Sequence, residues 1–189
     1  MKIATGLLLC AFTGGAMAAE IRVLSAGAVE PGLRAAAAAF KKQSGHEVNI
    51  AFNTAPEIRK RIGGGEAFDV VIAPPAALEE FAAAGKLTVE RVALGRVGLG
   101  VAVRPGAAVM EHVLKGKGRE IGFGPVTEIL QHREKGLKLV GLLPPEVQNY
   151  TSYSAAPMTA AASAELARVF VRYLGSPESK ALFVGAGID

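Results

Sequence analysis

Two short loops carry the residues of this sequence whose types and spacing can do chemistry. The first loop, Ser25-Ala26-Gly27-Ala28, follows an apolar run that begins at Ile21 and precedes a helix that Pro31 opens. The second loop, Asn53-Thr54-Ala55, follows the strand-like segment Glu47–Phe52 and precedes another helix. Because the first N–H groups of a helix lack internal partners and lie at the positive end of its dipole, both loops suit a small anion.

Several side chains of these loops can either stabilise the local structure or bind a ligand. Ser25 can donate a hydrogen bond to an oxyanion, or it can hold its own loop in place. Thr54 can cap the following helix, and Glu57 stands three residues later, in the arrangement of a capping box. Such a cap leaves Asn53 and the nearby N–H groups able to face a ligand. Glu30 adds a negative charge near the first helix start, which counts against a highly charged anion.

No motif of a known catalytic or metal centre accompanies the two loops. The sequence has no GxSxG, no HExxH and no phosphate-binding loop that ends in Gly-Lys-Ser or Gly-Lys-Thr. Its three histidines, His46, His112 and His132, are isolated in polar surroundings, without a second ligand at helical spacing. We therefore expect no catalytic residue, no metal site, no cofactor and no enzymatic activity.

Residues 1–18 have the pattern of a cleavable export signal. Lys2 precedes the apolar stretch Ile3–Phe12, and Ala16-Met17-Ala18 supplies an A-x-A cleavage site. The apolar stretch is shorter than the roughly 20 residues that cross a bilayer. The sequence thus predicts cleavage after Ala18, a periplasmic location and no membrane-spanning segment. Cys10, the single cysteine, lies inside this signal, so the mature chain is expected to form no disulfide.

The size and charge of the chain narrow the class of partner. About 170 residues remain after the signal, which suits one domain of ordinary size with a real core. The 21 Lys and Arg residues slightly outnumber the 17 Asp and Glu residues, and the formal net charge is +4. The two signs are scattered among each other, with no basic block interleaved with aromatic residues. This pattern does not support nucleic-acid binding, whereas a mildly basic protein can attract an anionic solute.

The segments that position the two loops alternate between strand and helix from Ile21 to Gly85. Phe68–Ala73 is a third strand, apolar after Asp69, and Ala76–Ala84 is a short helix that Gly85 ends. This order predicts an α/β fold with a mainly parallel sheet flanked by helices. Ligands of such sheets lie outside the carboxyl ends of the strands, where both loops fall.

The remaining sequence predicts a second series of strands and helices. The strand-like segments are Val97–Val103, Glu120–Gly124, Leu137–Leu143 and Asn149–Ala156. The helical segments are Ala107–Leu114, Pro125–Gln131, the amphipathic Ala160–Leu174 and a last short helix after Ser176-Pro177.

Several of these segments resemble the ModA-like molybdate-binding periplasmic proteins of ABC importers. The similar stretches are IRVLSAGAVEPGLRAAAAAFKKQSGHEV, FNTAPEIRKRI, FDVVIAPP, EIGFGPVTEIL, Leu142–Glu146 and Asn149–Ser154. The resemblance covers nearly the whole mature chain. It implies a type II periplasmic binding protein fold, in which two α/β lobes hold a dehydrated oxyanion with hydroxyl groups and backbone amides. It also implies an ABC permease as the membrane partner.

The sequence departs from that family's pattern at the residues that would touch the oxyanion. The resemblance aligns Ala28 and Ala55 with the serine of each first-lobe loop, and Phe123 with a second-lobe tyrosine. Each lost donor removes a hydrogen bond worth about 1.5–3 kcal/mol to a charged partner. A different or less charged solute is therefore an alternative to molybdate. The substrate-binding residues that we predict are Ser25, Ala26, Gly27, Ala28, Asn53, Thr54, Ala55 and Phe123.

The middle of the chain is short for a protein with two lobes. Val103 is soon followed by the strand-like segment Glu120–Gly124, so the second lobe is expected to be largely missing. We predict a signal peptide (residues 1–18), the N-terminal part of the first α/β lobe (19–94), a crossover with a reduced second lobe (95–148), and a return to the first lobe with C-terminal helices (149–189).

These observations predict a periplasmic solute-binding component of an ABC importer, for molybdate, a related small oxyanion or another small solute. The alternative is a reduced protein–protein interaction module that has lost solute binding. An exposed apolar patch where the second lobe should pack would favour that alternative. An exported hydrolase is the weakest hypothesis, because a nucleophile, a base and an acid would have to converge in a chain with few histidines.

Overall fold

Seven strands form one sheet in the part of the chain that the computed structural model describes, residues 19–103 and 121–189. The elements are β1 (Glu20–Ala26), a 3₁₀ turn (Gly27–Val29), α1 (Glu30–Ser44), β2 (Glu47–Asn53), α2 (Ala55–Gly63), β3 (Val70–Ala73), α3 (Pro75–Ala83), β4 (Val92–Val103), β5 (Ile121–Pro125), α5 (Val126–Gln131), β6 (Lys138–Leu142), β7 (Tyr150–Pro157), α6 (Ala164–Leu174) and α7 (Pro177–Gly185). The strand order is β2-β1-β3-β7-β4-β5, and β6 also pairs with β4.

The strands of this sheet do not all run in the same direction. β1 pairs in parallel with β2 and β3, as the alternating strand and helix pattern predicts. β7 pairs antiparallel with β3 and β4, and β4 pairs antiparallel with β5 and β6. The α/β fold is thus confirmed, but the expected parallel pairing is limited to the first three strands. Antiparallel strands need no crossover helix, so the chain can leave through β4 and return beside it through β7.

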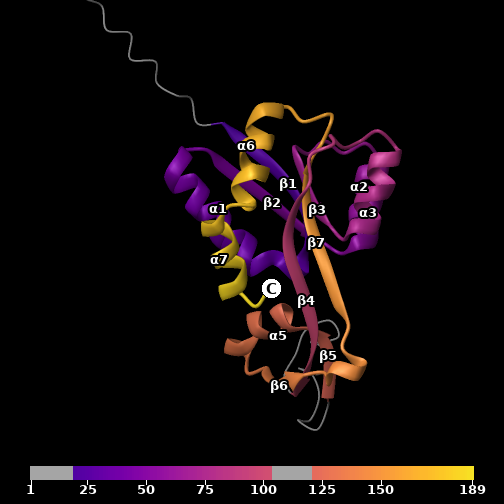
Figure 1. The fold of residues 1–189 in the computed structure, drawn as a ribbon, viewed down its shortest axis with the longest axis vertical. Helices are drawn as coiled ribbons and strands as arrows, with labels where there is room; N and C mark the ends of the chain where they lie inside the picture. The colour runs from indigo at the N-terminus through magenta and orange to yellow at the C-terminus, as the bar shows by residue number, and fades with distance from the viewer. Residues whose placement is uncertain (1–18, 104–120) are drawn as a thin grey trace, which may run out of the picture.

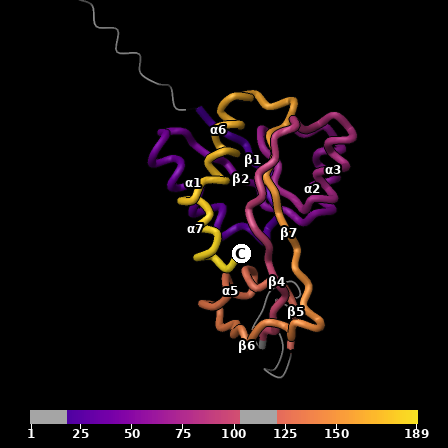
Figure 2. The backbone as a smooth tube through the Cα atoms, viewed as in Figure 1, coloured from indigo at the N-terminus to yellow at the C-terminus, as the bar shows by residue number. Residues whose placement is uncertain are grey.

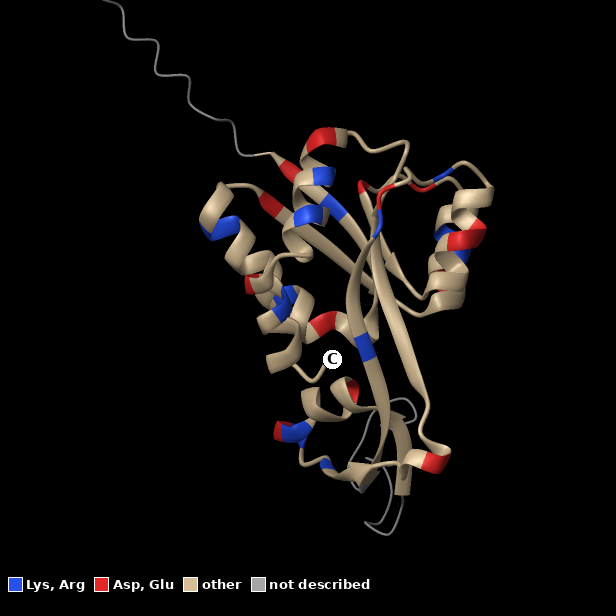
Figure 3. Ribbon diagram, in the orientation of Figure 1, with Lys and Arg blue, Asp and Glu red and all other residues tan. Residues whose placement is uncertain are grey.

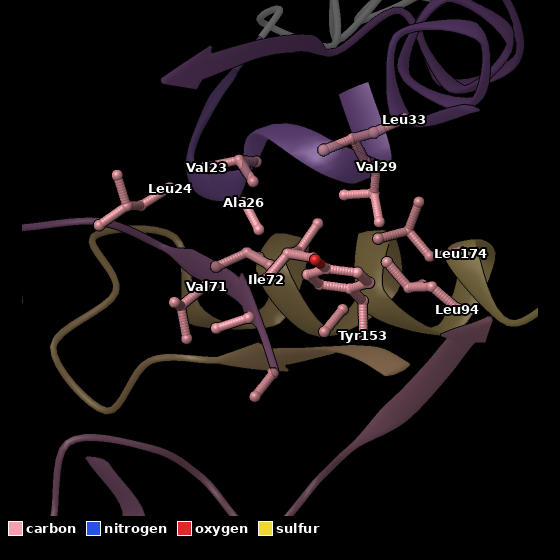
Figure 4. Close-up of a cluster of buried hydrophobic side chains, with 14 of the residues drawn as sticks. Val23, Leu24, Ala26, Val29, Leu33, Val71, Ile72, Leu94, Tyr153 and Leu174 are labelled. Atoms are coloured by element: carbon pink, nitrogen blue, oxygen red, sulfur yellow. The ribbon is translucent and has the colours of Figure 1, made fainter. Parts of the chain in front are cut away.

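Helices cover both faces of the sheet. In Figure 1, α1, α6 and α7 lie on one side of the strands and α2 and α3 lie on the other. All four residues of β3 are buried, because β3 lies in the middle of the sheet with both faces covered. Figure 4 shows side chains of β1, β3, β7 and the start of α1 packed together in this core. The core therefore lies directly beneath the carboxyl ends of β1, β2 and β3.

A smaller group of elements surrounds the far half of β4 (Figures 1 and 2). β5 and β6 both pair with β4 there, and α5 packs against them. Ala102, Ile129 and Leu137 form a small buried cluster, with Leu139 packed on it. Figure 2 shows β4 and β7 side by side between this group and the larger part of the sheet. This group falls within the residues for which the reduced second lobe is predicted.

Two element boundaries differ by more than two residues from the sequence-based prediction. The helix that we expected from Ala160 begins at Ala164, because the Ser163 N–H donates a hydrogen bond to the Asp69 carboxylate at 3.2 Å and the preceding residues form turns. The strand that we expected from Val97 begins earlier, at Val92. The predicted signal peptide and the predicted helix Ala107–Leu114 lie outside the described residues. Within the described ranges, no helix is both long and apolar enough to cross a membrane.

Charged residues of both signs are interspersed along the ribbon of the described chain (Figure 3). Arg59 Nε lies 2.6 Å from Glu80 Oε2 and joins α2 to α3. Arg34 Nε lies 2.7 Å from Glu30 Oε1, one turn away on α1. Exposed pairs of this kind add little stability, about 0–1 kcal/mol each, so the buried apolar core provides most of it.

Candidate functional site

A cavity of about 410 Å³ lies at the carboxyl ends of β1 and β2, beside the end of β3. Its walls combine small, apolar and polar side chains: Ala26, Gly27, Ala28, Phe52, Asn53, Thr54, Ala55, Pro74, Pro125, Glu128 and Tyr153. Ligand cavities in proteins commonly have volumes of about 300–1,000 Å³. The connections from β1 to α1, from β2 to α2 and from β3 to α3 all contribute residues. The structure therefore brings the two predicted loops together around one space.

The first loop presents bare backbone to this cavity. β1 ends at Ala26, and the 3₁₀ turn Gly27–Val29 continues directly into α1. Gly27 lines the cavity, and a Cβ atom added there would meet no atom within 4 Å. The N–H groups at the start of this helical stretch have no partner one turn earlier. They can therefore donate hydrogen bonds to an acceptor in the cavity, as the sequence predicts.

The second loop differs from the prediction in the role of its threonine. Thr54 is the N-cap residue of α2, in an extended conformation, but its side chain makes no capping hydrogen bond. The predicted capping box with Glu57 is therefore wrong. The first turn of α2 already contains Pro56, which has no N–H group to be capped. Thr54 lines the cavity beside Asn53 and Ala55, so its hydroxyl group is available to a ligand.

Residues from the second half of the chain close the cavity from the opposite side. Pro125 ends β5, Glu128 belongs to α5 and Tyr153 belongs to β7. The fully buried Thr127 donates a hydrogen bond from its hydroxyl to the Ala28 carbonyl oxygen at 2.7 Å. This bond joins α5 to the first loop directly. The shortened second half thus still supplies a wall for the cavity.

Two of the predicted site residues do not line the cavity. Ser25 is fully buried, and its hydroxyl donates a hydrogen bond to the neighbouring Ala26 carbonyl at 3.1 Å, which is the structural role left open above. Phe123 lies on β5 and is 58 % exposed. Pro125, two residues further along β5, lines the cavity instead.

Sequence reasoning missed five residues of the cavity wall: Phe52, Pro74, Pro125, Glu128 and Tyr153. Pro125 and Glu128 belong to the stretch EIGFGPVTEIL, so the family resemblance carried the signal that could have found them. Tyr153 alternates with its neighbours in a strand, but alternation alone does not show which face of a sheet meets a ligand. In Figure 4 the hydroxyl of Tyr153 points toward the loop that carries Ala26.

The titratable groups of the cavity are carboxylic and phenolic. Burial raises the pKa of Glu128, and the negative charge of Glu30 raises it further, whereas His132 lowers it. Burial also raises the pKa of Tyr153, with a further contribution from the charge of Glu128, whereas the side chain of Thr151 lowers it. The described wall residues include no lysine or arginine. Within the described ranges, no cluster of His, Cys, Asp and Glu residues has the composition of a metal site.

Replacing Thr127 by Val should destabilise the protein by about 1–3 kcal/mol, because the Ala28 carbonyl would stay buried without its partner. Chemical denaturation monitored by circular dichroism measures this free energy of unfolding. Thr88→Val is the matched control and should have a smaller effect, because Thr88 is partly buried and its hydroxyl has no hydrogen-bond partner among the described residues. Equal stability of Thr127→Val and the wild type would contradict a structural role for this hydrogen bond.

Replacing Glu128 by Gln should raise the unfolding temperature at pH 7. The raised pKa means that the folded protein binds a proton at Glu128 more tightly than the unfolded chain does, so folding stability falls as the pH rises through this pKa. Glutamine removes that penalty. The difference between variant and wild type should shrink as the pH is lowered below about 4, the ordinary range of a glutamate. An unfolding temperature at pH 7 that is no higher than that of the wild type would contradict this prediction.

Comparison with known proteins identifies the class to which this fold and cavity belong. The family of bacterial extracellular solute-binding proteins matches residues 21–117 and 107–189, which together include nearly the whole chain. The chain therefore belongs to the family of bacterial extracellular solute-binding proteins. By its description, this family consists of extracellular proteins that bind solutes.

Individual relatives of the chain have different ligands. It is similar to the periplasmic molybdate-binding protein of Azotobacter vinelandii, with a TM-score of 0.74 and 16 % identity over 89 % of this chain and 98 % of that one. It is similar to the sulfate-binding protein SubI of Mycobacterium tuberculosis, with a TM-score of 0.73 and 13 % identity over 90 % and 86 % of the two chains. A Pseudomonas aconitate isomerase is 25 % identical over 249 residues, covering 98 % of this chain and 95 % of that protein. The alignment is longer than this chain of 189 residues, so some positions of the relative have no counterpart here. A shortened lobe would leave such a gap.

Proposed function

We propose that this protein is the solute-binding component of an ABC importer and holds one small anionic or polar solute in the cavity beside Gly27 and Thr54. The observation that carries this proposal is the convergence of three strand-to-helix connections on a cavity of about 410 Å³. The helix starts offer N–H donors, and Asn53 and Thr54 offer polar side chains. The protein would deliver the solute to a permease without chemical change.

Molybdate, which the family resemblance implies, is one candidate for this solute. A tetrahedral oxyanion needs many donors, because it must exchange its water shell for hydrogen bonds with the protein. The cavity presents Ala28 and Ala55 where the resemblance places serines, so backbone N–H groups and Thr54 would have to replace the missing hydroxyls. Glu128 would repel the anion when ionised. These features support a less charged solute at least as well as molybdate.

Catalysis has less support than binding, even though one relative is an aconitate isomerase. Glu128 and Tyr153 could in principle exchange protons with a ligand, since both line the cavity. However, aconitate carries three carboxylates, and the described wall residues provide no cationic side chain to pair with them. We therefore propose that the protein has no catalytic residues.

We extend the proposal to the export and organisation of the chain. Cleavage after Ala18 would release the mature protein into the periplasm. Residues 95–148 would form the crossover and the reduced second lobe, and residues 149–189 would return to the first lobe. The position of β5, β6 and α5 around the far half of β4 supports this division.

Isothermal titration calorimetry on the purified protein tests the proposed function. We expect binding of at least one compound from a panel of molybdate, tungstate, sulfate, trans-aconitate and small carboxylates, including amino acids. Incubation with trans-aconitate followed by NMR would detect isomerisation, which we do not expect. Absence of heat with every compound at millimolar concentration would refute solute binding in this cavity.

The alternative function, a protein-interaction module, has one observation in its favour. Ile121, Phe123, Val140 and Leu142 on β5 and β6 are each more than half exposed, close to where the rest of a second lobe would pack. If a second copy of this chain covered them, light scattering would show a dimer that Phe123→Ser converts to a monomer. A concentration-independent monomer would remove this alternative.

A further inference from the structure

The two sides of the cavity differ in charge. On one side, the helical stretches that begin at Gly27 and Ala55 point the positive ends of their dipoles toward the space. On the other side, Glu128 contributes the single carboxylate among the described wall residues. Tyr153, which is 8 % exposed, stands on the same side, near enough for its pKa to respond to the charge of Glu128. A ligand in this space therefore meets donors at one end and acceptors at the other.

The surroundings of Glu128 leave its charge without a strong partner among the described residues. Glu30 of α1 adds a second negative charge, and Arg34 already holds Glu30 at 2.7 Å. His132 directly follows the helix that carries Glu128, and its Nδ1 atom lies 2.9 Å from the Glu128 backbone carbonyl oxygen. A partly buried carboxylate in this position gains most from a ligand that brings a positive hydrogen-bond donor.

We propose that the ligand of this cavity is a small zwitterion, whose carboxylate faces the helix starts at Gly27 and Ala55 and whose ammonium group pairs with Glu128. This inference rests on the proposed function, because it assumes that a solute occupies the cavity. The volume of about 410 Å³ exceeds what one tetrahedral oxyanion fills and leaves room for a compact organic molecule. The apolar wall residues Phe52, Pro74 and Pro125 then contact its carbon skeleton.

Three acids with the same three-carbon skeleton test this proposal by calorimetry. L-Alanine, L-lactate and propionate share the carboxylate and differ in one substituent, which is an ammonium group, a hydroxyl group or a hydrogen atom. Because a hydrogen bond between charged groups is worth about 1.5–3 kcal/mol, L-alanine should bind at least about tenfold more tightly than propionate. L-Lactate, a neutral donor at this position, should bind with intermediate affinity.

Glu128→Gln should remove this preference selectively. The variant keeps the size of the side chain and loses its charge, so affinity for L-alanine should fall about tenfold while affinity for propionate stays equal or rises. Glu134→Gln makes the same exchange at an exposed position outside the cavity wall and should leave both affinities unchanged.

The pH dependence of binding is an independent test of the pairing between the ammonium group and Glu128. Glu30 of α1, Tyr153 of β7 and His132, which follows α5, are the titratable groups that interact with Glu128. Burial raises the pKa of Glu128 and the charge of Glu30 raises it further, while His132 lowers it. Only the ionised carboxylate pairs with an ammonium group, so L-alanine should bind more weakly as the pH falls through this raised pKa. An oxyanion that needs protonated Glu128 as a donor would show the opposite trend.

The outcomes separate this inference from the proposed function. If molybdate, sulfate or propionate binds and L-alanine binds no more tightly than propionate, the zwitterion proposal is overturned and solute binding stands. If no compound of either panel binds, both fail. If Glu128→Gln weakens the binding of L-alanine and of propionate equally, the pairing is also overturned. Equal losses would indicate general damage to the cavity.

Discussion

Replacing Gly27 by Asp is expected to weaken ligand binding by about 100-fold or more while leaving the protein folded. Gly27 lines the cavity and has open space where a Cβ atom would lie, so the new carboxylate can enter the site without a steric clash. There it would compete with the ligand for the same N–H groups and repel its anionic end, and such like-charge contacts cost several kcal/mol. An acidic residue in the first turn of a helix is favourable, so stability should not fall. Calorimetry with L-alanine and molybdate measures the loss.

Gly141→Asp is the matched control for this exchange. Gly141 lies on β6, outside the cavity wall, and a Cβ atom there also meets nothing within 4 Å. The Gly141→Asp variant should bind the ligand as tightly as the wild type, since it adds the same charge away from the site. Unchanged binding by Gly27→Asp would show that the ligand does not approach the start of α1.

Replacing Phe170 by Ala should produce the largest loss of stability, about 3–5 kcal/mol. Phe170 is fully buried on α6, and its ring meets the Phe40 ring of α1 edge-on with 5.0 Å between centroids. The substitution leaves a cavity that the close-packed neighbours can fill only in part. In a protein of this size the melting temperature should fall by about 10 °C. Urea denaturation and thermal unfolding both measure the effect.

Val169→Ala is the control, because the neighbouring side chain on the same helix is 38 % exposed. It should change stability by less than about 1 kcal/mol, since alanine has a higher helix propensity than valine and little buried area is lost. A bound ligand should raise the melting temperature of Phe170→Ala and of the wild type alike, because ligand stabilisation depends on affinity and concentration. A Phe170→Ala variant as stable as Val169→Ala would contradict the packing between α6 and α1.

The three strand-to-helix connections around the cavity could be predicted from local sequence. Pro31, Pro56 and Pro75 lie in the first turns of α1, α2 and α3, where the missing N–H group of proline costs nothing. The strand before each helix shows apolar alternation or a continuous apolar run. These signals extend over a few residues, so they are readable without knowledge of the rest of the fold.

The roles of individual side chains in those loops could not be predicted in the same way. Ser25 is fully buried, because β1 lies between β2 and β3 and both faces of the sheet are covered at this end of the strand. Thr54 stands at the N-cap position yet makes no capping bond, although its sequence context favours one. The direction of β7 could not be predicted either. Whether a strand pairs parallel or antiparallel depends on which distant strands become its neighbours.

By itself, the sequence determined the α/β order of elements, the place of the two loops and the resemblance to solute-binding proteins, because local periodicity and motifs encode all three. Only the tertiary structure decided that Glu128 and Tyr153 face these loops and that Ser25 does not. Thr127 and Ala28, whose hydrogen bond joins the two sides of the cavity, are separated by 99 residues. Contacts over such distances arise from the packing of whole elements, and no local pattern of residue types records them.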